Sequence, residues 1–175
     1  MDQTHKIIEF TLVYNKHKKG LFNYVLKMIY DKMACEDIIQ NVFLKLFENM
    51  DKIRNTGSLQ YWLFTTARNE VFTYFRNKKI RVDQFYVQDS DEVDILSENH
   101  LDIDYEQKEL RDLISGELEK MAFEQREVFL LKEYGGLSYK EIAAIMKIDE
   151  ELVKSRLFKT RQKLIKRLSK ILQNS

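Results

Sequence analysis

The C-terminal part of the chain carries residues whose chemistry suits nucleic acid. Eight basic residues with no acidic residue among them lie between positions 154 and 170, namely Lys154, Arg156, Lys159, Arg161, Lys163, Lys166, Arg167 and Lys170. Lysine suits phosphate oxygens, arginine can pair with guanine, and an exposed aromatic ring can meet a thymine methyl group. A basic C-terminal helix can also be an ordinary solvated surface. The elements that would position these side chains therefore decide between the two interpretations.

Those elements are predicted to be two short helices joined by a tight turn. Ser138 followed by Glu141 forms a capping box, which predicts that a helix starts there. After the turn Lys147–Asp149, the Asp149 side chain can cap the next helix. That helix would bury Val153, Leu157, Leu164 and Leu168. Its outer face would present Lys154, Ser155, Arg156, Phe158, Lys159 and Arg161. This combination indicates a helix-turn-helix that reads duplex DNA in the major groove.

The whole chain is predicted to be all-α. Its 175 residues include no proline and only five glycines, so helix breakers are scarce. Apolar residues recur at helical spacing within 21–29, 38–50 and 59–75. We expect two small helical domains, residues 1–84 and 107–175, joined by an acidic flexible linker at 85–106. The acidic residues of that stretch are Asp89, Asp91, Glu92, Asp94, Glu98, Asp102, Asp104 and Glu106.

Other features of the composition argue against several classes of protein. The single cysteine, Cys35, allows no intrachain disulfide, which fits a cytoplasmic protein. We expect no signal peptide and no transmembrane helix, because no apolar run is long enough. His5, His17 and His100 are scattered, and no nucleophile elbow or phosphate-binding loop is present. We therefore expect no enzyme activity, no cofactor, no metal site and no small-molecule substrate.

Five segments resemble the sigma-70 family of RNA polymerase sigma factors, and most closely its extracytoplasmic-function (ECF) group. Residues 125–129 (QREVF), 136–143 (GLSYKEIA) and 153–157 (VKSRL) resemble region 4 of that family. Upstream, residues 35–45 (CEDIIQNVFLK) resemble region 2.2, and residues 62–69 (WLFTTARN) resemble regions 2.3 and 2.4. Together the motifs cover nearly the whole chain, in the family's order and spacing.

The chain departs from the family pattern at three places in region 4. Met121–Glu124 replaces a segment that usually contains Leu-Pro, so the following helix start should be less sharp. Lys147 stands where the helix-turn-helix turn usually has glycine, and forcing it into the left-handed region would cost about 1 kcal/mol. That turn is therefore expected to be reshaped. Glu151-Leu152 replaces the usual Gly-Thr, so contacts at the start of the recognition helix, and with them the −35 sequence that it reads, are expected to differ.

The resemblance implies two DNA-reading parts, with residues 1–84 as region 2 and residues 107–175 as region 4. Region 4 would read the −35 element as duplex through Lys154, Ser155, Arg156, Phe158, Lys159 and Arg161. Region 2 would hold the melted non-template strand of the −10 element, which needs flat surfaces and cations. The candidates there are Tyr61, Arg68, Asn69, Phe72, Arg76 and Lys79. Phe64, Lys78 and Arg81 are further possibilities, whereas Trp62 is more readily a core residue.

The resemblance also implies protein partners. The polar face formed by Asp37, Gln40, Asn41 and Lys45 would dock on the β′ clamp helices of core RNA polymerase. Region 4 would meet the β flap, and an anti-sigma factor is an expected inhibitor. The acidic linker would follow the polymerase channel toward the RNA exit, or it would be a simple solvated spacer. From periodicity alone, the Asp37–Lys45 face is only a solvated helix surface.

Three other functions remain open at this level. A stand-alone helix-turn-helix regulator would bind duplex stably by itself at a palindromic site. An RNA-modifying enzyme or nuclease on a helical scaffold is disfavoured, because the sequence shows no carboxylate or metal cluster. A sigma-like protein that binds polymerase without promoter selectivity stays possible because of the altered turn at Lys147.

Overall fold

The computed structural model describes residues 2–53, 56–79 and 105–174, and these residues form seven α-helices, one short 3-10 helix and no strand. The predicted all-α fold is confirmed. The elements in chain order are α1 (Gln3–Ile29), α2 (Lys32–Asn49), η1 (Met50–Lys52), α3 (Thr56–Asn77), α4 (Tyr105–Glu119), α5 (Phe123–Glu133), α6 (Tyr139–Met146) and α7 (Glu150–Gln173). Most of the predicted linker lies outside the described residues, and α4 begins two residues before the expected boundary at 107.

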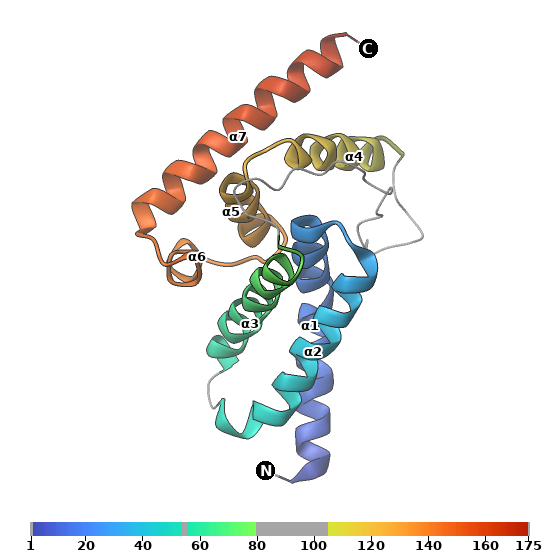
Figure 1. Ribbon diagram of the computed structural model, residues 1–175, viewed down its shortest axis with the longest axis vertical. Helices are drawn as coiled ribbons and strands as arrows, with labels where there is room; N and C mark the ends of the chain where they lie inside the picture. The colour runs from blue at the N-terminus through green and yellow to red at the C-terminus, as the bar shows by residue number, and fades with distance from the viewer. Residues whose placement is uncertain (1, 54–55, 80–104, 175) are drawn as a thin grey trace.

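Helices α1, α2 and α3 pack against one another and form the N-terminal half (Figure 1). The predicted apolar stripes form its core, with Leu21, Val25, Val42, Leu63 and Val71 fully buried. Local signals define the sharp junction between α1 and α2. Tyr30 ends α1 in the left-handed conformation, at φ 52°, and the Asp31 carboxylate caps α2 by accepting the Ala34 N–H at 3.0 Å.

Helices α4 to α7 form the C-terminal half. The apolar run at 128–131 lies on α5, where Val128, Leu130 and Leu131 are fully buried. After α5 the chain turns through Gly136, which has φ +64°, a conformation that suits glycine. The long helix α7 then contacts α4, α5 and α6.

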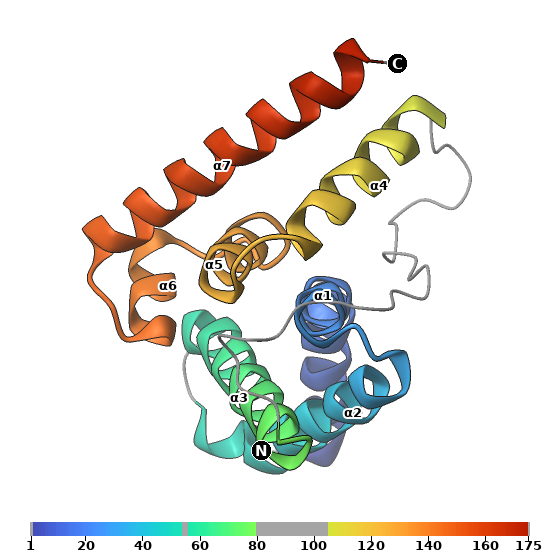
Figure 2. The same cartoon turned by 45° about the horizontal axis from the view of Figure 1, so that its top comes forward.

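The two halves lie directly against each other, with α1 contacting α5 and α3 contacting α6 (Figures 1 and 2). Gly20 of α1 makes this close approach possible. A Cβ atom at Gly20 would lie only 2.6 Å from the backbone oxygen of Tyr134. Aromatic rings also join the halves, because Phe123 of α5 packs edge-on against Phe72 and Phe75 of α3. The buried core is therefore continuous from one half to the other.

Candidate nucleic-acid interface

The helix-turn-helix is built by the local signals that the sequence predicts. The Ser138 hydroxyl accepts the Glu141 N–H at 3.1 Å and starts α6. The Asp149 carboxylate accepts the Leu152 N–H at 2.7 Å and starts α7. Both caps satisfy backbone donors that have no partner inside their helix. The two predicted helix starts are thus confirmed, and they set the direction in which α7 leaves the turn.

The turn between α6 and α7 keeps the geometry that glycine usually provides. Lys147 adopts φ 57° and ψ 44°, and the Ile148 N–H donates to the Ala143 carbonyl at 3.1 Å. The expectation of a reshaped turn is therefore wrong. The helices on either side of the turn are fixed by the two caps and by the buried Ile145, Met146 and Val153. Lys147 is therefore held in the left-handed conformation despite its energetic cost.

This strain leads to a stability prediction for Lys147→Gly. Glycine occupies the left-handed region without the Cβ clash, so the variant should unfold at higher temperature, by the equivalent of about 1 kcal/mol. The greater freedom of glycine in the unfolded chain opposes part of that gain. Thermal unfolding followed by circular dichroism measures the change. Lys140→Gly, at an ordinary helical position, should destabilise the chain instead, and equal loss in both variants would contradict the strain argument.

The predicted outer face of α7 is only partly open to solvent. Lys154, Ser155, Lys159 and Phe158 are exposed, and Phe158 retains 65% of its accessible surface. Arg156 is half-buried and lies 3.5 Å from the Glu124 carboxylate. Arg161 pairs with Glu133 at 2.5 Å. Two of the six candidate residues therefore already contact carboxylates on α5, and the other four form the accessible basic and aromatic surface.

The predicted strand-binding face of α3 divides in a similar way. Tyr61, Asn69 and Arg76 are exposed along the helix and Lys79 is exposed in the turn after it, whereas Phe72 is half-buried. Phe64 retains only 1% of its surface and packs edge-on against Tyr24. It is therefore a core residue in this structure rather than part of an open strand-binding surface. Trp62 is partly buried against the core, and Arg81 lies outside the described residues.

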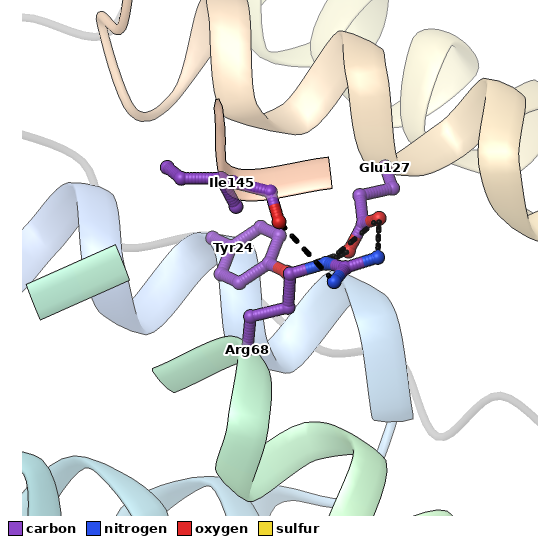
Figure 3. A network of polar contacts seen from close by, with 4 residues as sticks. All are labelled: Tyr24, Arg68, Glu127 and Ile145. Carbon is purple, nitrogen blue, oxygen red and sulfur yellow. Dashed lines mark hydrogen bonds and ion pairs between the residues drawn. The ribbon is translucent and has the colours of Figure 1, made fainter. Parts of the chain in front are cut away.

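Arg68 crosses from α3 to the C-terminal half and forms the main polar contact between the halves (Figure 3). Its guanidinium donates to both carboxylate oxygens of Glu127, with Nε 3.1 Å from Oε2 and Nη2 3.1 Å from Oε1. The Tyr24 hydroxyl donates to the same carboxylate at 2.8 Å. A third Arg68 nitrogen lies 3.4 Å from the Ile145 carbonyl, and the guanidinium stacks over Phe72. We call the three side chains Tyr24, Arg68 and Glu127 the interdomain network.

The interdomain network is largely closed to water. The Glu127 side chain is 1% exposed and the Arg68 side chain 19% exposed. Burial, together with the neighbouring Glu127 carboxylate, holds the pKa of Tyr24 well above its usual value. The phenol therefore stays protonated and continues to donate to Glu127. A buried carboxylate that accepts from both a guanidinium and a phenol is well satisfied, and losing either donor would be costly.

Two candidate DNA-binding arginines share one cavity. Arg68 of α3 and Arg156 of α7 both line a hollow of about 520 Å³ between the halves. Glu124 and Glu127 of α5 line the same hollow, and each carboxylate contacts one of the two arginines. In this arrangement Arg68 contacts an acidic residue of the other half, whereas Arg156 contacts one of its own half. Neither presents its full guanidinium to an outside ligand.

The predicted polymerase-facing surface is accessible. Asp37, Gln40, Asn41 and Lys45 are all exposed on α2, and Lys45 pairs with Glu70 at 2.5 Å. Nearby Cys35 points inward, and burial, more than the adjacent Glu36, raises its thiol pKa to about 12. In the described ranges, no cluster of three or more potential metal ligands occurs. No helix of the described residues is both long and apolar enough to cross a bilayer.

Comparison with known proteins accounts for both halves. Residues 13–80 match the family model for sigma-70 region 2, and residues 111–164 match the model for sigma-70 region 4. The chain belongs to the sigma-70 family. Helices α1–α3 therefore correspond to region 2, and the helix-turn-helix of α6 and α7 belongs to region 4. The predicted strand-binding residues on α3 thus fall within the region 2 match, and the predicted duplex-reading residues on α7 fall within the region 4 match.

Curated relatives place the chain in the ECF group of sigma factors. It is 29% identical over 152 residues to the ECF RNA polymerase sigma factor SigM of Bacillus subtilis, covering 87% of this chain and 90% of the relative. It is 24% identical over 173 residues to the RNA polymerase sigma-H factor of Pseudomonas aeruginosa, covering 95% and 89%. Both alignments span region 2 and region 4 together.

Solved structures agree with this fold. The sigma factor RpoE from Bartonella quintana, in complex with the anti-sigma factor NepR, is 28% identical with a TM-score of 0.66, covering 92% of this chain and 94% of that one. CnrH, in complex with the cytosolic domain of CnrY, gives a TM-score of 0.61 at 20% identity, covering 91% and 87%. The second likeness supports the fold alone.

Proposed function

We propose that the chain is a sigma factor that binds core RNA polymerase and directs transcription initiation at specific promoters. The observation that carries this proposal is the pairing of two sigma-70 modules in one chain, with a correctly capped helix-turn-helix in the second. Region 4 would read the −35 duplex through the exposed face of α7. Region 2 would hold the melted −10 strand along α3 and dock on the polymerase through α2.

Promoter geometry requires that the two halves separate before both DNA elements are bound. The −10 and −35 elements lie roughly 25 base pairs apart, which is about 85 Å of duplex at 3.4 Å per base pair. Arg68 and Arg156 cannot span that length while they line one cavity. The structure therefore represents a closed form, in which the interdomain network must break when polymerase and promoter bind.

The closed form also bears on the alternative of a stand-alone regulator. Such a protein would need an open duplex-reading face in the free chain. Here Arg156 lines the hollow between the halves beside Arg68 and Phe72 of α3, and Arg156 and Arg161 also contact Glu124 and Glu133 of their own half. A sigma factor needs the face only after it has joined the polymerase, so weak duplex binding by the free chain is consistent with its role.

Transcription in vitro tests the proposed function. Purified chain is added to core RNA polymerase with a library of genomic fragments, in the absence of any anti-sigma factor. The proposal predicts transcripts that start at a small set of promoters sharing −10 and −35 sequences. Core polymerase that gains no promoter-specific transcripts on addition of the chain would overturn it.

The region 2 assignment leads to a prediction for Asn69→Ala. Asn69 is exposed on α3 and its amide can hydrogen-bond a base edge, so its loss should reduce open-complex formation roughly tenfold. Binding to closed duplex promoter should change little. Permanganate reactivity of −10 thymines measures opening, and electrophoretic mobility measures duplex binding. Asn15→Ala, at an exposed position on α1, is the matched control. Equal opening by the Asn69 and Asn15 variants would remove Asn69 from the strand-binding surface.

A further inference from the structure

The first turn of α7 presents a carboxylate on the face that is predicted to read DNA. The Glu151 side chain keeps 86% of its surface exposed. It stands four residues before Ser155 and seven before Phe158, so helical periodicity places these three exposed side chains along one side of α7. Val153 and Leu157 are buried on the opposite side. Glu151 therefore lies in the middle of the outer face rather than at its edge.

The fold fixes the turn that carries Glu151. The Asp149 carboxylate caps α7 by accepting the Leu152 N–H at 2.7 Å, and the buried Val153 anchors the same turn from inside. Figures 1 and 2 both show the start of α7 at the edge of the molecule, next to α6. In a helix-turn-helix, the first residues of the second helix are the ones that contact base edges. Glu151 is thus placed to enter the major groove.

A carboxylate on this face has to meet a hydrogen-bond donor. Phosphate oxygens and the major-groove edges of guanine and thymine present acceptors, which repel it. Adenine offers its N6 amino group beside the N7 acceptor, whereas cytosine offers its N4 amino group with no acceptor next to it on the same base edge. An ionised carboxylate only accepts hydrogen bonds, so cytosine satisfies it best.

The contacts of Glu151 inside the chain leave it able to turn to a base. One carboxylate oxygen lies 3.4 Å from Nζ of Lys154, and both side chains are exposed. A long, exposed pair of this kind is weak, so its members exchange readily with other partners. In the groove, Lys154 can turn to a phosphate and Glu151 to a base. The neighbouring Leu152, which is 37% exposed, would limit water at the contact and make the hydrogen bond more discriminating.

We propose that Glu151 is a specificity-determining residue, which selects a cytosine in the −35 element by accepting its N4 amino hydrogen. This inference rests on the proposed function and adds a residue to those predicted for the duplex-reading face. Sigma factors of the family usually have glycine at this position, and glycine has no side chain to offer a base. The Glu151 contact therefore gives this chain a −35 preference of its own.

A switch of base preference tests the proposal. Core RNA polymerase carrying the full chain transcribes a promoter library with a randomised −35 element, and sequencing of the transcripts gives the preference at each position. The wild-type chain should favour cytosine at one position by about 5- to 150-fold. Glu151→Gln should lose that preference and favour adenine there, because a glutamine amide pairs with N6 and N7 of adenine. An unchanged preference at every position would overturn the proposal.

Glu150→Gln is the matched control. Glu150 is exposed in the same turn of α7, but it stands three residues before Val153 and so lies toward the buried side of the helix. Its substitution removes the same charge near the same phosphates and should change no base preference. The same change of preference in both variants would mean that Glu151 acts through its charge alone, and direct reading of a base would be refuted.

A modified template tests the hydrogen bond itself. N4-methylation of the selected cytosine replaces the amino hydrogen that faces the major groove and leaves the base pair intact. Transcription by the wild-type holoenzyme should fall about as far as it does with a wrong base at that position. The Glu151→Gln holoenzyme should respond little to the methyl group. Full use of the methylated template by the wild-type chain would contradict the proposed contact.

Selection from a random duplex pool with the full chain alone separates this inference from the proposed function. Specific transcripts without a cytosine preference would refute the role of Glu151 and leave the proposed function standing. If no specific transcripts are made, the proposed function fails. Enrichment of cytosine by the wild-type chain and of adenine by Glu151→Gln would then still support Glu151 as a base-reading residue, whereas a pool without base preference would refute it.

Discussion

Replacing Glu127 with glutamine should open the contact between the two halves of the free chain. The substitution keeps the shape of the side chain but removes the charge that pairs with Arg68 in a nearly dry environment. Breaking a buried ion pair from one side costs several kcal/mol, and the amide retains part of the hydrogen bonding. We therefore expect the closed form to lose about 2–3 kcal/mol, which shifts the balance between closed and open forms by roughly 30- to 150-fold.

Two measurements on the free chain detect the opening expected of Glu127→Gln. Small-angle X-ray scattering should give a larger radius of gyration. Affinity for an isolated −35 duplex should rise about tenfold, because Arg68 and Phe72 of α3 would no longer close the hollow that Arg156 lines, although the Arg156–Glu124 pair inside the C-terminal half remains. Glu70→Gln is the matched control, since it breaks the exposed Lys45–Glu70 pair inside the N-terminal half and should change neither quantity. An unchanged radius in both variants would mean that the interdomain network does not hold the halves together.

Gly20→Ala tests the same closed form without touching any charge. The added methyl group would lie about 2.6 Å from the Tyr134 backbone oxygen, so α1 and α5 could not keep their separation. It should therefore also expand the free chain. Gly116→Ala on α4, where a Cβ atom would meet nothing within 4 Å, is the matched control. Opening by Glu127→Gln without opening by Gly20→Ala would show that the electrostatic contact matters and the close packing does not.

Replacing Arg156 with alanine should weaken use of the −35 element. A bidentate arginine–guanine contact is worth about 1–3 kcal/mol, so transcription from a −35-dependent promoter should fall roughly 5- to 150-fold. Binding to core polymerase should change little, because the substitution leaves the predicted docking surface on α2 intact and removes one side chain from region 4, which is predicted to meet the β flap. Lys163→Ala removes the same charge from an exposed position of α7 that contacts Gln125 and is the matched control.

A promoter with a substituted −35 element distinguishes recognition from damage to the fold. The Arg156→Ala defect should nearly disappear on that template, since the wild-type chain also lacks its −35 contact there. Equal losses on both templates, or loss of polymerase binding, would mean that the substitution unfolds region 4 or that Arg156 does not face DNA. The Glu124 partner of Arg156 is largely exposed to solvent, so the ion pair adds little to the stability of the fold. We therefore expect the variant to remain folded.

The helix-turn-helix could be predicted from sequence because its determinants are local. Ser138 and Glu141 are three residues apart, and Asp149 caps the helix that follows it directly. The same holds for the apolar stripes of α1 to α3, which periodicity alone assigns to the core. The turn at Lys147 was predicted wrongly because the local cost of a left-handed lysine is smaller than the packing on either side of it.

The contact between the halves could not be predicted, because its partners are remote in sequence. Arg68 and Glu127 are 59 residues apart, and Tyr24 and Glu127 are 103 residues apart. Glu127 and its neighbour Arg126 are both buried, and Arg126 has no exposed surface. The local sequence pattern does not indicate that either charged residue is buried. Phe64 illustrates the same difficulty. An aromatic residue on a basic helix can either stack on a base or pack in the core. Only its contact with Tyr24, which is remote in sequence, shows that Phe64 is a core residue.

We infer that the chain carries two DNA-reading parts, which lie against each other in the free chain and would lie far apart on a promoter. Energy transfer between dyes at Asn77→Cys on α3 and Gln162→Cys on α7, both exposed positions, tests it directly. Transfer should be measurable in the free chain and should fall to near zero with core polymerase and promoter DNA, where the parts would be of the order of 85 Å apart. Transfer that stays the same in that complex, while specific transcripts are made, would show that the two halves do not separate on the promoter.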